Sequence, residues 1–176
     1  MNMRAQQEKA EALRTLHQGP DIVVLPNAWD AASAVIFANA GFPAIATTSA
    51  GIAATLGYPD GQRVSLDEMV SVVRRIAAAV DCPVTADMEA GYGATVADII
   101  ATAQAVIAAG AVGMNLEDAA GAAQRQLIDV AVQIERIRAI REAGTATLII
   151  PLTYVDVFCY ASVWRSERGP GRNGCD

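Results

Sequence analysis

The sequence predicts an α/β fold made of repeated strand–helix units, of the (β/α)8 barrel type. Short apolar segments of strand length alternate along the chain with longer segments of helical period. The strand-length segments begin near residues 22, 44, 83, 112 and 147, a mean spacing that fits the roughly 30 residues of one barrel unit. A whole barrel needs about 250 residues. Because the chain has 176 residues, we expect only about the first five units, and length alone also fits an open, doubly wound sheet.

The first 47 residues supply one strand–helix unit and the strand of the next. We predict a polar helix over residues 3–17, a buried strand at 22–25, a helix over 30–40 that ends at Gly41, and a second strand at 44–47.

The next two helices have clear start signals. Ser65 and Glu68 have the S-x-x-E spacing of a capping box, and apolar residues at helical period follow them. Thr95 and Asp98 open the second helix with the same spacing. A third strand is predicted between these helices, at residues 83–87.

The last complete unit begins with a fourth strand at residues 112–116. Asp129 is predicted to cap the helix that follows it. Within this helix Val130, Ile134 and Ile137 are expected to face inward, because they share one helical face.

The chain changes character after a predicted fifth strand at residues 147–152. Residues 153–176 show no apolar period of 2 or 3.6, yet they hold four of the nine aromatic residues and two of the three cysteines. We therefore divide the chain into a partial barrel domain at 1–152 and an atypical tail at 153–176. A frameshift or a premature stop would produce such a tail; this is a hypothesis that the uninterrupted coding DNA would test.

Composition makes several classes of protein unexpected. The net charge is −6 and Lys9 is the only lysine, so neither nucleic acid nor an anionic membrane surface is an expected partner. No apolar run reaches the ~18 residues of a membrane span, and the N-terminus has no signal-peptide core. Three cysteines without metal-type spacing favour a reducing, cytoplasmic compartment. A single histidine, His17, argues against a Ser-His-Asp triad or a multi-histidine zinc site.

Carboxylates gather at the predicted carboxyl ends of the strands, where parallel β/α folds bind their ligands. Asp87 and Glu89 end the third strand and Glu117 ends the fourth. Asp87 and Glu89 are two residues apart, so both would project to the same side of an extended segment. Three carboxylates at one mouth repel one another unless a cation joins them, and oxygen ligands without His or Cys select Mg²⁺ or Mn²⁺ over zinc. The alternative is that these acids cap helices or are solvated in loops.

Small residues follow the second strand. The backbone N–H groups of Ser49, Ala50 and Gly51 could bind a substrate carboxylate, because small side chains allow close approach. Residues 91–93 read Gly-Tyr-Gly before a helix, but Val96 stands where a dinucleotide fingerprint has its last glycine. A dinucleotide cofactor is therefore not expected.

Five motifs follow the predicted strands in order. They are LPNAWD at 25–30, TSAG at 48–51, GYPDG at 57–61, DMEAGYG at 87–93 and NLED at 115–118. Each is weak alone, but in this order they are specific, and together they resemble the isocitrate lyase / phosphoenolpyruvate mutase family. The resemblance runs from about residue 20 to about residue 150. The family fold is a (β/α)8 barrel, which favours the barrel over the open sheet.

The resemblance implies a metal-dependent enzyme. It implies Mg²⁺ (or Mn²⁺) bound through Asp87, Glu89 and Glu117, often through water, with Asp60, Asp87 and Glu117 as the catalytic residues. Family members act on small 2-oxo acids, or on 2-hydroxy acids that are cleaved to them. The metal chelates the carboxylate and the 2-oxygen and stabilises the enolate left when a C–C or C–P bond breaks.

The resemblance also implies the substrate contacts and the assembly. Ser49, Ala50 and Gly51 would hold the substrate carboxylate, with Trp29 and Asp87 also in the substrate site. Members exchange terminal helices between subunits, so a homo-oligomer is expected.

The sequence departs from the family at three points. Residues 119–125 lack the catalytic cysteine loop of the isocitrate and methylisocitrate lyases, and the mutase-type lysine after the Glu-Asp pair is missing. The substrate arginine of the fifth strand is absent from residues 152–156. Two hypotheses therefore remain open: a Mg²⁺-dependent lyase or decarboxylase, or a truncated, non-catalytic member that keeps a metal-binding half-site.

Overall fold

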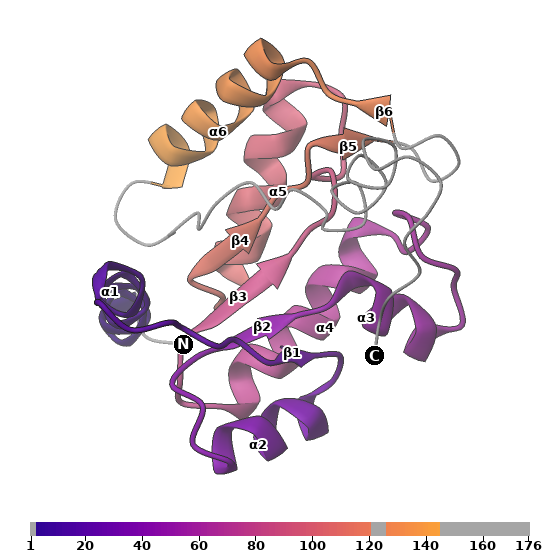
Figure 1. Ribbon diagram of the computed structural model, residues 1–176. Coiled ribbons are helices and arrows are strands. Elements are labelled where there is room, and N and C mark those ends of the chain that lie inside the picture. The colour runs from indigo at the N-terminus through magenta and orange to yellow at the C-terminus, as the bar shows by residue number, and fades with distance from the viewer. Residues whose placement is uncertain (1–2, 121–125, 145–176) are drawn as a thin grey trace, which may run out of the picture.

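The computed structural model describes residues 3–120 and 126–144. Its centre is a four-stranded parallel sheet in the order β1-β2-β3-β4 (Figure 1). A doubly wound sheet reverses its strand order at a switch point, whereas the strands of a (β/α)8 barrel follow one another around the sheet. The sequential order therefore confirms the barrel type. The strands are β1 (Asn27–Ala28), β2 (Ile45–Thr47), β3 (Val84–Asp87) and β4 (Gly113–Asn115).

Helices connect these strands, and a short antiparallel hairpin follows β4. The capping boxes predicted at Ser65 and Thr95 are both present. One helix, α3, was not predicted. The helices are α1 (Met3–Gln18), α2 (Ala31–Asn39), α3 (Ser49–Leu56), α4 (Leu66–Ala79), α5 (Val96–Ala108) and α6 (Val130–Gly144), and the hairpin is β5 (Ala119–Ala120) with β6 (Gln126–Leu127).

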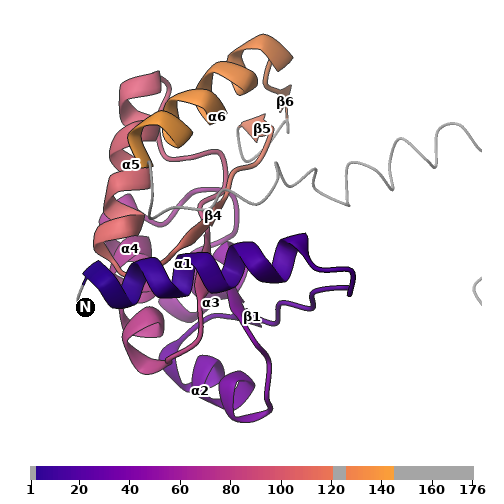
Figure 2. The ribbon, with the colours of Figure 1, turned by 90° about the vertical axis from the view of Figure 1, so that its left-hand side faces the viewer.

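Helices pack on one face of the sheet, and α1 crosses its amino ends. Ile45 and Val84 pack with apolar residues of α2 and α4. Figure 2 shows α1 lying across this end of the sheet. Leu13 of α1 is fully buried against Ala44 and Val112, which directly precede β2 and β4. Helix α1 therefore covers the amino ends of the strands. The carboxyl ends lie on the opposite side of the sheet, where a site is expected.

The prediction of a buried strand at residues 22–25 is wrong. The strand begins later, at β1, and Ile22 and Val24 are 94% and 59% exposed. Pairing with β2 reaches back only to Pro26, whose carbonyl accepts from the Ala46 N–H at 3.0 Å. Within the described residues β1 pairs with β2 alone, and residues 22–25 pair with no strand.

The predicted inward face of α6 is also wrong in part. Val130 is 72% exposed and Ile134 43%, while Gln133, Arg136 and Ile140 are buried. Ile137 is partly buried against the main core, as predicted. The fifth strand predicted at 147–152 and the tail at 153–176 lie outside the described residues.

Candidate active site

The site is built around Asp87, the last residue of β3. Its Oδ2 accepts hydrogen bonds from the Ser49 N–H at 2.9 Å and from the Ser49 hydroxyl at 2.7 Å. Its own N–H donates to Thr47 Oγ1 at 2.9 Å. Ser49 opens α3 and Thr47 ends β2, so the neighbouring unit fixes the orientation of this carboxylate.

Glu89 lies beside Asp87, but for a different reason from the one predicted. The backbone at Glu89 is left-handed (φ +49°) rather than extended, so a turn brings the two acids together. The Glu89 N–H donates to Asp87 Oδ1 at 3.2 Å, and the Tyr92 hydroxyl donates to Glu89 Oε1 at 3.2 Å. The Glu89 residue is only 5% exposed, so its carboxyl group is largely removed from water.

Glu117 is tied to the same loop through its backbone. Its N–H donates to the Glu89 carbonyl at 2.7 Å, which joins the loops that follow β3 and β4. In the part of the chain that the structure describes, no group of three acidic, His or Cys side chains is close enough to ligate one ion directly. The structure therefore brings Asp87 and Glu89 together and holds Glu117 next to them by its main chain.

Burial and like charges act together on Glu89. The pKa of Glu89 is raised from 4.5 to about 7, chiefly by the loss of hydration on burial and also by the negative charges of Asp87 and Asp60, while the Tyr92 hydrogen bond acts in the opposite direction. The pKa of the Tyr92 hydroxyl is raised as well, first by burial and then by the charge of Glu89. The turn after β3 therefore concentrates negative charge in a place that water reaches poorly.

The predicted substrate amides are in the first turn of α3. The Ser49 N–H is bonded to Asp87, and the Gly51 N–H donates to the capping Thr48 hydroxyl at 3.2 Å. Among the described residues the Ala50 N–H has no partner, and Ala50 is exposed. The helix start thus offers one unused amide donor beside Asp87.

Two further predicted residues lie at the rim. Asp60 is exposed, and its Oδ1 accepts from the Gly61 N–H at 2.9 Å. Trp29 is 41% exposed and packs edge-on against Phe37, with ring centroids 6.4 Å apart. Its Cβ also lies close to Gly51, so a side chain there would crowd the tryptophan.

Sequence reasoning missed Thr47 and Tyr92. Thr47 is the polar residue that ends the buried strand β2, and Tyr92 lies inside the glycine-flanked segment after Glu89. Neither residue is acidic, and nothing in the local sequence distinguishes their hydroxyls from other polar groups, so no sequence signal links them to Asp87 and Glu89.

The donor set fits a hard divalent cation. Carboxylate oxygens are the side-chain ligands that Mg²⁺ prefers, and Mg²⁺ keeps several waters while one or two carboxylates bind it. Asp87 and Glu89 supply such oxygens, and a cation would offset the repulsion that Glu89 experiences from Asp87 and Asp60.

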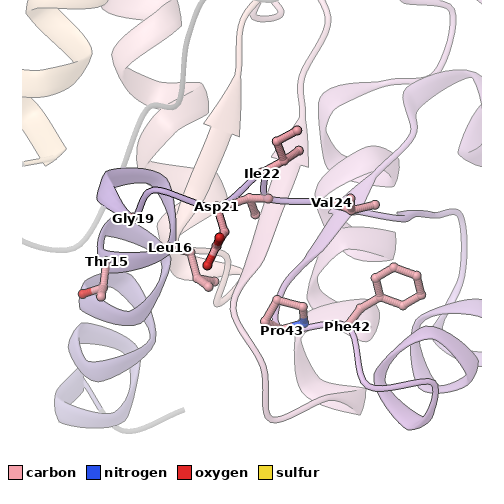
Figure 3. Close-up of a pocket in the computed structure, with 9 residues that line it drawn as sticks. Thr15, Leu16, Gly19, Asp21, Ile22, Val24, Phe42 and Pro43 are labelled. Carbon is pink, nitrogen blue, oxygen red and sulfur yellow. The ribbon is translucent and has the colours of Figure 1, made fainter.

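A cavity of about 390 Å³ lies elsewhere, at the amino side of the sheet (Figure 3). It is bounded by the end of α1, by residues 21–24 and by Phe42 and Pro43, and Asp21 is its one charged lining residue. Because α/β barrels bind substrate at the opposite end, this cavity is not part of the candidate site.

Replacing Glu89 with glutamine is expected to stabilise the metal-free chain at alkaline pH. The folded state raises the pKa of Glu89, so it binds more protons than the unfolded state between about pH 4.5 and pH 7. Stability from this group is therefore lost as pH rises through that window. We expect the free energy of unfolding of Glu89→Gln to exceed that of the native chain by about 2 kcal/mol at pH 8 and to equal it closely at pH 4.

Urea unfolding in EDTA at both pH values measures this difference. Asp67→Asn, at an exposed position in the first turn of α4, is the control for loss of one negative charge. An equal gain at pH 4 and pH 8 would contradict the assignment.

Removing the Thr102 hydroxyl is expected to weaken the turn after β3. Thr102 of α5 is fully buried, and its Oγ1 donates to the Gly91 carbonyl at 2.8 Å. Thr102→Val keeps the shape but leaves that carbonyl without its donor, which costs about 1–2 kcal/mol. Chemical denaturation measures the loss, with the exposed Thr55→Val as the matched control. Equal losses in the two variants would show that the bond to Gly91 contributes nothing specific.

A sequential parallel sheet with acids at its carboxyl edge places the chain in the (β/α)8-barrel class. A family model described as phosphoenolpyruvate phosphomutase matches residues 13–162. The chain belongs to this family, and structures that it resembles are members of the PEP mutase/isocitrate lyase superfamily.

Similar proteins agree with this assignment. Oxaloacetate decarboxylase of Bradyrhizobium sp. strain BTAi1 is 35% identical over 149 residues, which cover 81% of this chain and 51% of the relative. A Burkholderia cenocepacia J2315 protein provisionally named a lyase/mutase is 40% identical, with a TM-score of 0.76 over 84% of this chain and 52% of that one. Oxaloacetate acetylhydrolase in complex with its product oxalate is 27% identical, with a TM-score of 0.74 over 82% of this chain and 52% of that one.

The chain spans about half the length of the relatives it matches. Among the described residues no helix is long and apolar enough to cross a membrane.

Proposed function

We propose that the chain carries the metal half of a lyase or decarboxylase site for small 2-oxo or 2-hydroxy carboxylates. The observation that carries the proposal is the pair Asp87 and Glu89 at the carboxyl end of β3, one held by Ser49 and the other buried. Relatives named 2-methylisocitrate lyase and oxaloacetate decarboxylase support the substrate class.

In this proposal Asp87, Glu89 and Glu117 hold Mg²⁺ (or Mn²⁺), directly or through water. When bound, the ion supplies Lewis-acid stabilisation of negative charge that develops on the substrate. The buried position of Glu89 keeps the dielectric constant low, which strengthens every charge interaction in the site.

The remaining residues of the site orient Asp87 and bind the substrate. Ser49 holds Oδ2 of Asp87 and so fixes the direction in which Oδ1 points. The Ala50 amide at the start of α3 is the donor for a substrate carboxylate, which the helix dipole also favours. Asp60 faces solvent at the rim of the site, and in the described structure its carboxylate accepts a hydrogen bond from the Gly61 N–H alone. In this proposal Asp60 receives or supplies a proton.

Metal binding without turnover is the second candidate. It is favoured by the segment 119–125, which has no cysteine to act as the acid of the lyase subgroup. Both candidates share the metal site, so a metal measurement alone does not separate them.

Oxaloacetate decarboxylation separates the two candidates. We expect Mg²⁺-dependent loss of oxaloacetate above the rate with Mg²⁺ alone, and its disappearance in Asp87→Ala. Metal binding without any such rate would establish the non-catalytic candidate. No metal binding at all would contradict both.

We also propose a cytoplasmic homo-oligomer that binds neither nucleic acid nor membrane. The net charge of −6 supports the absence of polyanionic partners. Among the described residues one edge of β1 has no strand partner, and the exposed Ile22 and Val24 beside it support association through that edge.

A further inference from the structure

The buried face of helix α6 holds both apolar and polar side chains. Ile140 is fully buried and Ile137 is partly buried against the main core, while Gln133 and Arg136 beside them are 5% and 8% exposed. Packing of the two isoleucines does not account for the burial of the two polar side chains. Both of these polar side chains bond to loops of the candidate site.

Gln133 holds the main chain of Glu117. Its Nε2 donates to the Glu117 carbonyl at 3.1 Å, while the Glu117 N–H donates to the Glu89 carbonyl at 2.7 Å. The peptide groups on both sides of Glu117 are therefore fixed, one to α6 and one to the loop after β3.

The side-chain carbonyl of Gln133 is left unpaired in this position. Its Oε1 is buried and has no partner among the described residues. An unpaired buried carbonyl lowers stability, and an apolar side chain would fill the same space without that loss. A role limited to packing thus does not account for glutamine at this position.

Arg136 holds the end of the loop that carries Glu89. Its Nη2 donates to the Ala94 carbonyl at 3.3 Å. In the loop from Glu89 to Ala94 the backbone is left-handed at Glu89 (φ +49°), Gly91 (+94°) and Tyr92 (+57°). Residues other than glycine keep such a conformation only where the surroundings enforce it. Arg136 bonds to this segment two residues beyond Tyr92.

We propose that Gln133 and Arg136 are positioning residues that fix Glu117 and Glu89 relative to each other and thereby set the affinity of the site for a divalent cation. The inference rests on the proposed metal site. Neither side chain is assigned a contact with metal or substrate, and α6 acts on the site through two loop backbones.

Gln133→Met tests the first half of the proposal. Methionine keeps the length and the helix propensity but removes both the donor and the unpaired acceptor. We expect the Mn²⁺ dissociation constant, measured from the EPR signal of free Mn²⁺, to rise about tenfold or more, as for other outer-shell partners of metal ligands. We also expect faster hydrogen exchange at the Glu117 N–H in the metal-free chain.

Matched variants separate positioning from general damage to α6. Glu135→Gln lies on the exposed side of the helix and is expected to match the native chain in both measurements. Arg136→Met is expected to weaken Mn²⁺ binding, and Arg136→Lys, which keeps a charged donor, is expected to restore most of it.

Three outcomes decide the matter. Native Mn²⁺ affinity in Gln133→Met with native exchange at Glu117 overturns the proposal, as does a lower melting temperature with unchanged affinity, which indicates a structural role alone. If the native chain binds no Mn²⁺, the proposed function fails, and the predicted effect on metal affinity fails with it. Exchange at Glu117 then decides only the positioning: faster exchange in Gln133→Met supports the α6 contact and unchanged exchange overturns it.

Discussion

Asp87→Asn is expected to lower the affinity for Mn²⁺ by at least about 100-fold while leaving the chain folded. Asparagine keeps the shape of the side chain, and its one carbonyl oxygen can still accept from Ser49. What it loses is the negative charge and one of the two oxygens that the carboxylate offers an ion. Affinity for a hard cation depends on the number of charged ligands, so the effect on binding exceeds the effect on stability.

Asp81→Asn is the matched control for this experiment. Asp81 is exposed and precedes β3, at the amino end of the strand that Asp87 terminates. Mn²⁺ titration followed by EPR compares the two variants at one pH and one ionic strength. Equal losses in the two variants would indicate a general charge effect, and native affinity in Asp87→Asn would remove Asp87 from the site.

Gly91→Ala is expected to lower the free energy of unfolding by about 3 kcal/mol, from backbone strain and overpacking combined. Gly91 has φ +94°, and a Cβ there would come within 2.7 Å of both Ile99 Cδ1 and Leu116 Cδ1. Both side chains are fully buried, so neither has free space into which to move. The displaced turn carries Glu89, and Mn²⁺ affinity is expected to fall with stability.

Gly41→Ala isolates the strain from the clash. Gly41 has a similar φ of +90°, but nothing lies within 4 Å of the added Cβ. Gly41→Ala is expected to lower the free energy of unfolding by about 1 kcal/mol, which is the effect of the left-handed backbone alone. Chemical denaturation of both variants gives the difference, and equal losses would contradict the packing described around Gly91.

Local signals in the sequence were sufficient where the structure depends on neighbouring residues. The capping boxes at Ser65 and Thr95 satisfy the first amides of α4 and α5, so each helix begins where its sequence predicts. Gly41, with φ +90°, follows the end of α2, as expected of a helix-terminating glycine.

Elements that depend on distant contacts were predicted less well. The apolar run at 22–25 has strand propensity, but burial of Ile22 needs a neighbour on the other side of β1, which the described residues do not provide. The inward face of α6 was assigned from its apolar period, but the observed inward face also holds Gln133 and Arg136, which bond to distant loops.

The acids of the site could be predicted by type and place, but not their environment. Position after a parallel strand identifies Asp87 and Glu117 as candidates, because the fold gathers strand ends. The left-handed turn at Glu89 and its resulting burial depend on Tyr92, Thr102 and α6, which no local pattern reveals. Binding of a metal ion by the three acids, directly or through water, stays a prediction.

The most direct test of the central claim, that this site binds a divalent cation together with an oxo acid, is a thermal melt of the chain with Mg²⁺, with oxalate and with both. A ligand that binds only the folded state raises the midpoint by mass action. The account predicts a cooperative transition whose midpoint rises clearly only when both are present, and no such rise in Asp87→Asn. A cooperative melt that is indifferent to the pair, or an equal rise in the variant, would contradict it.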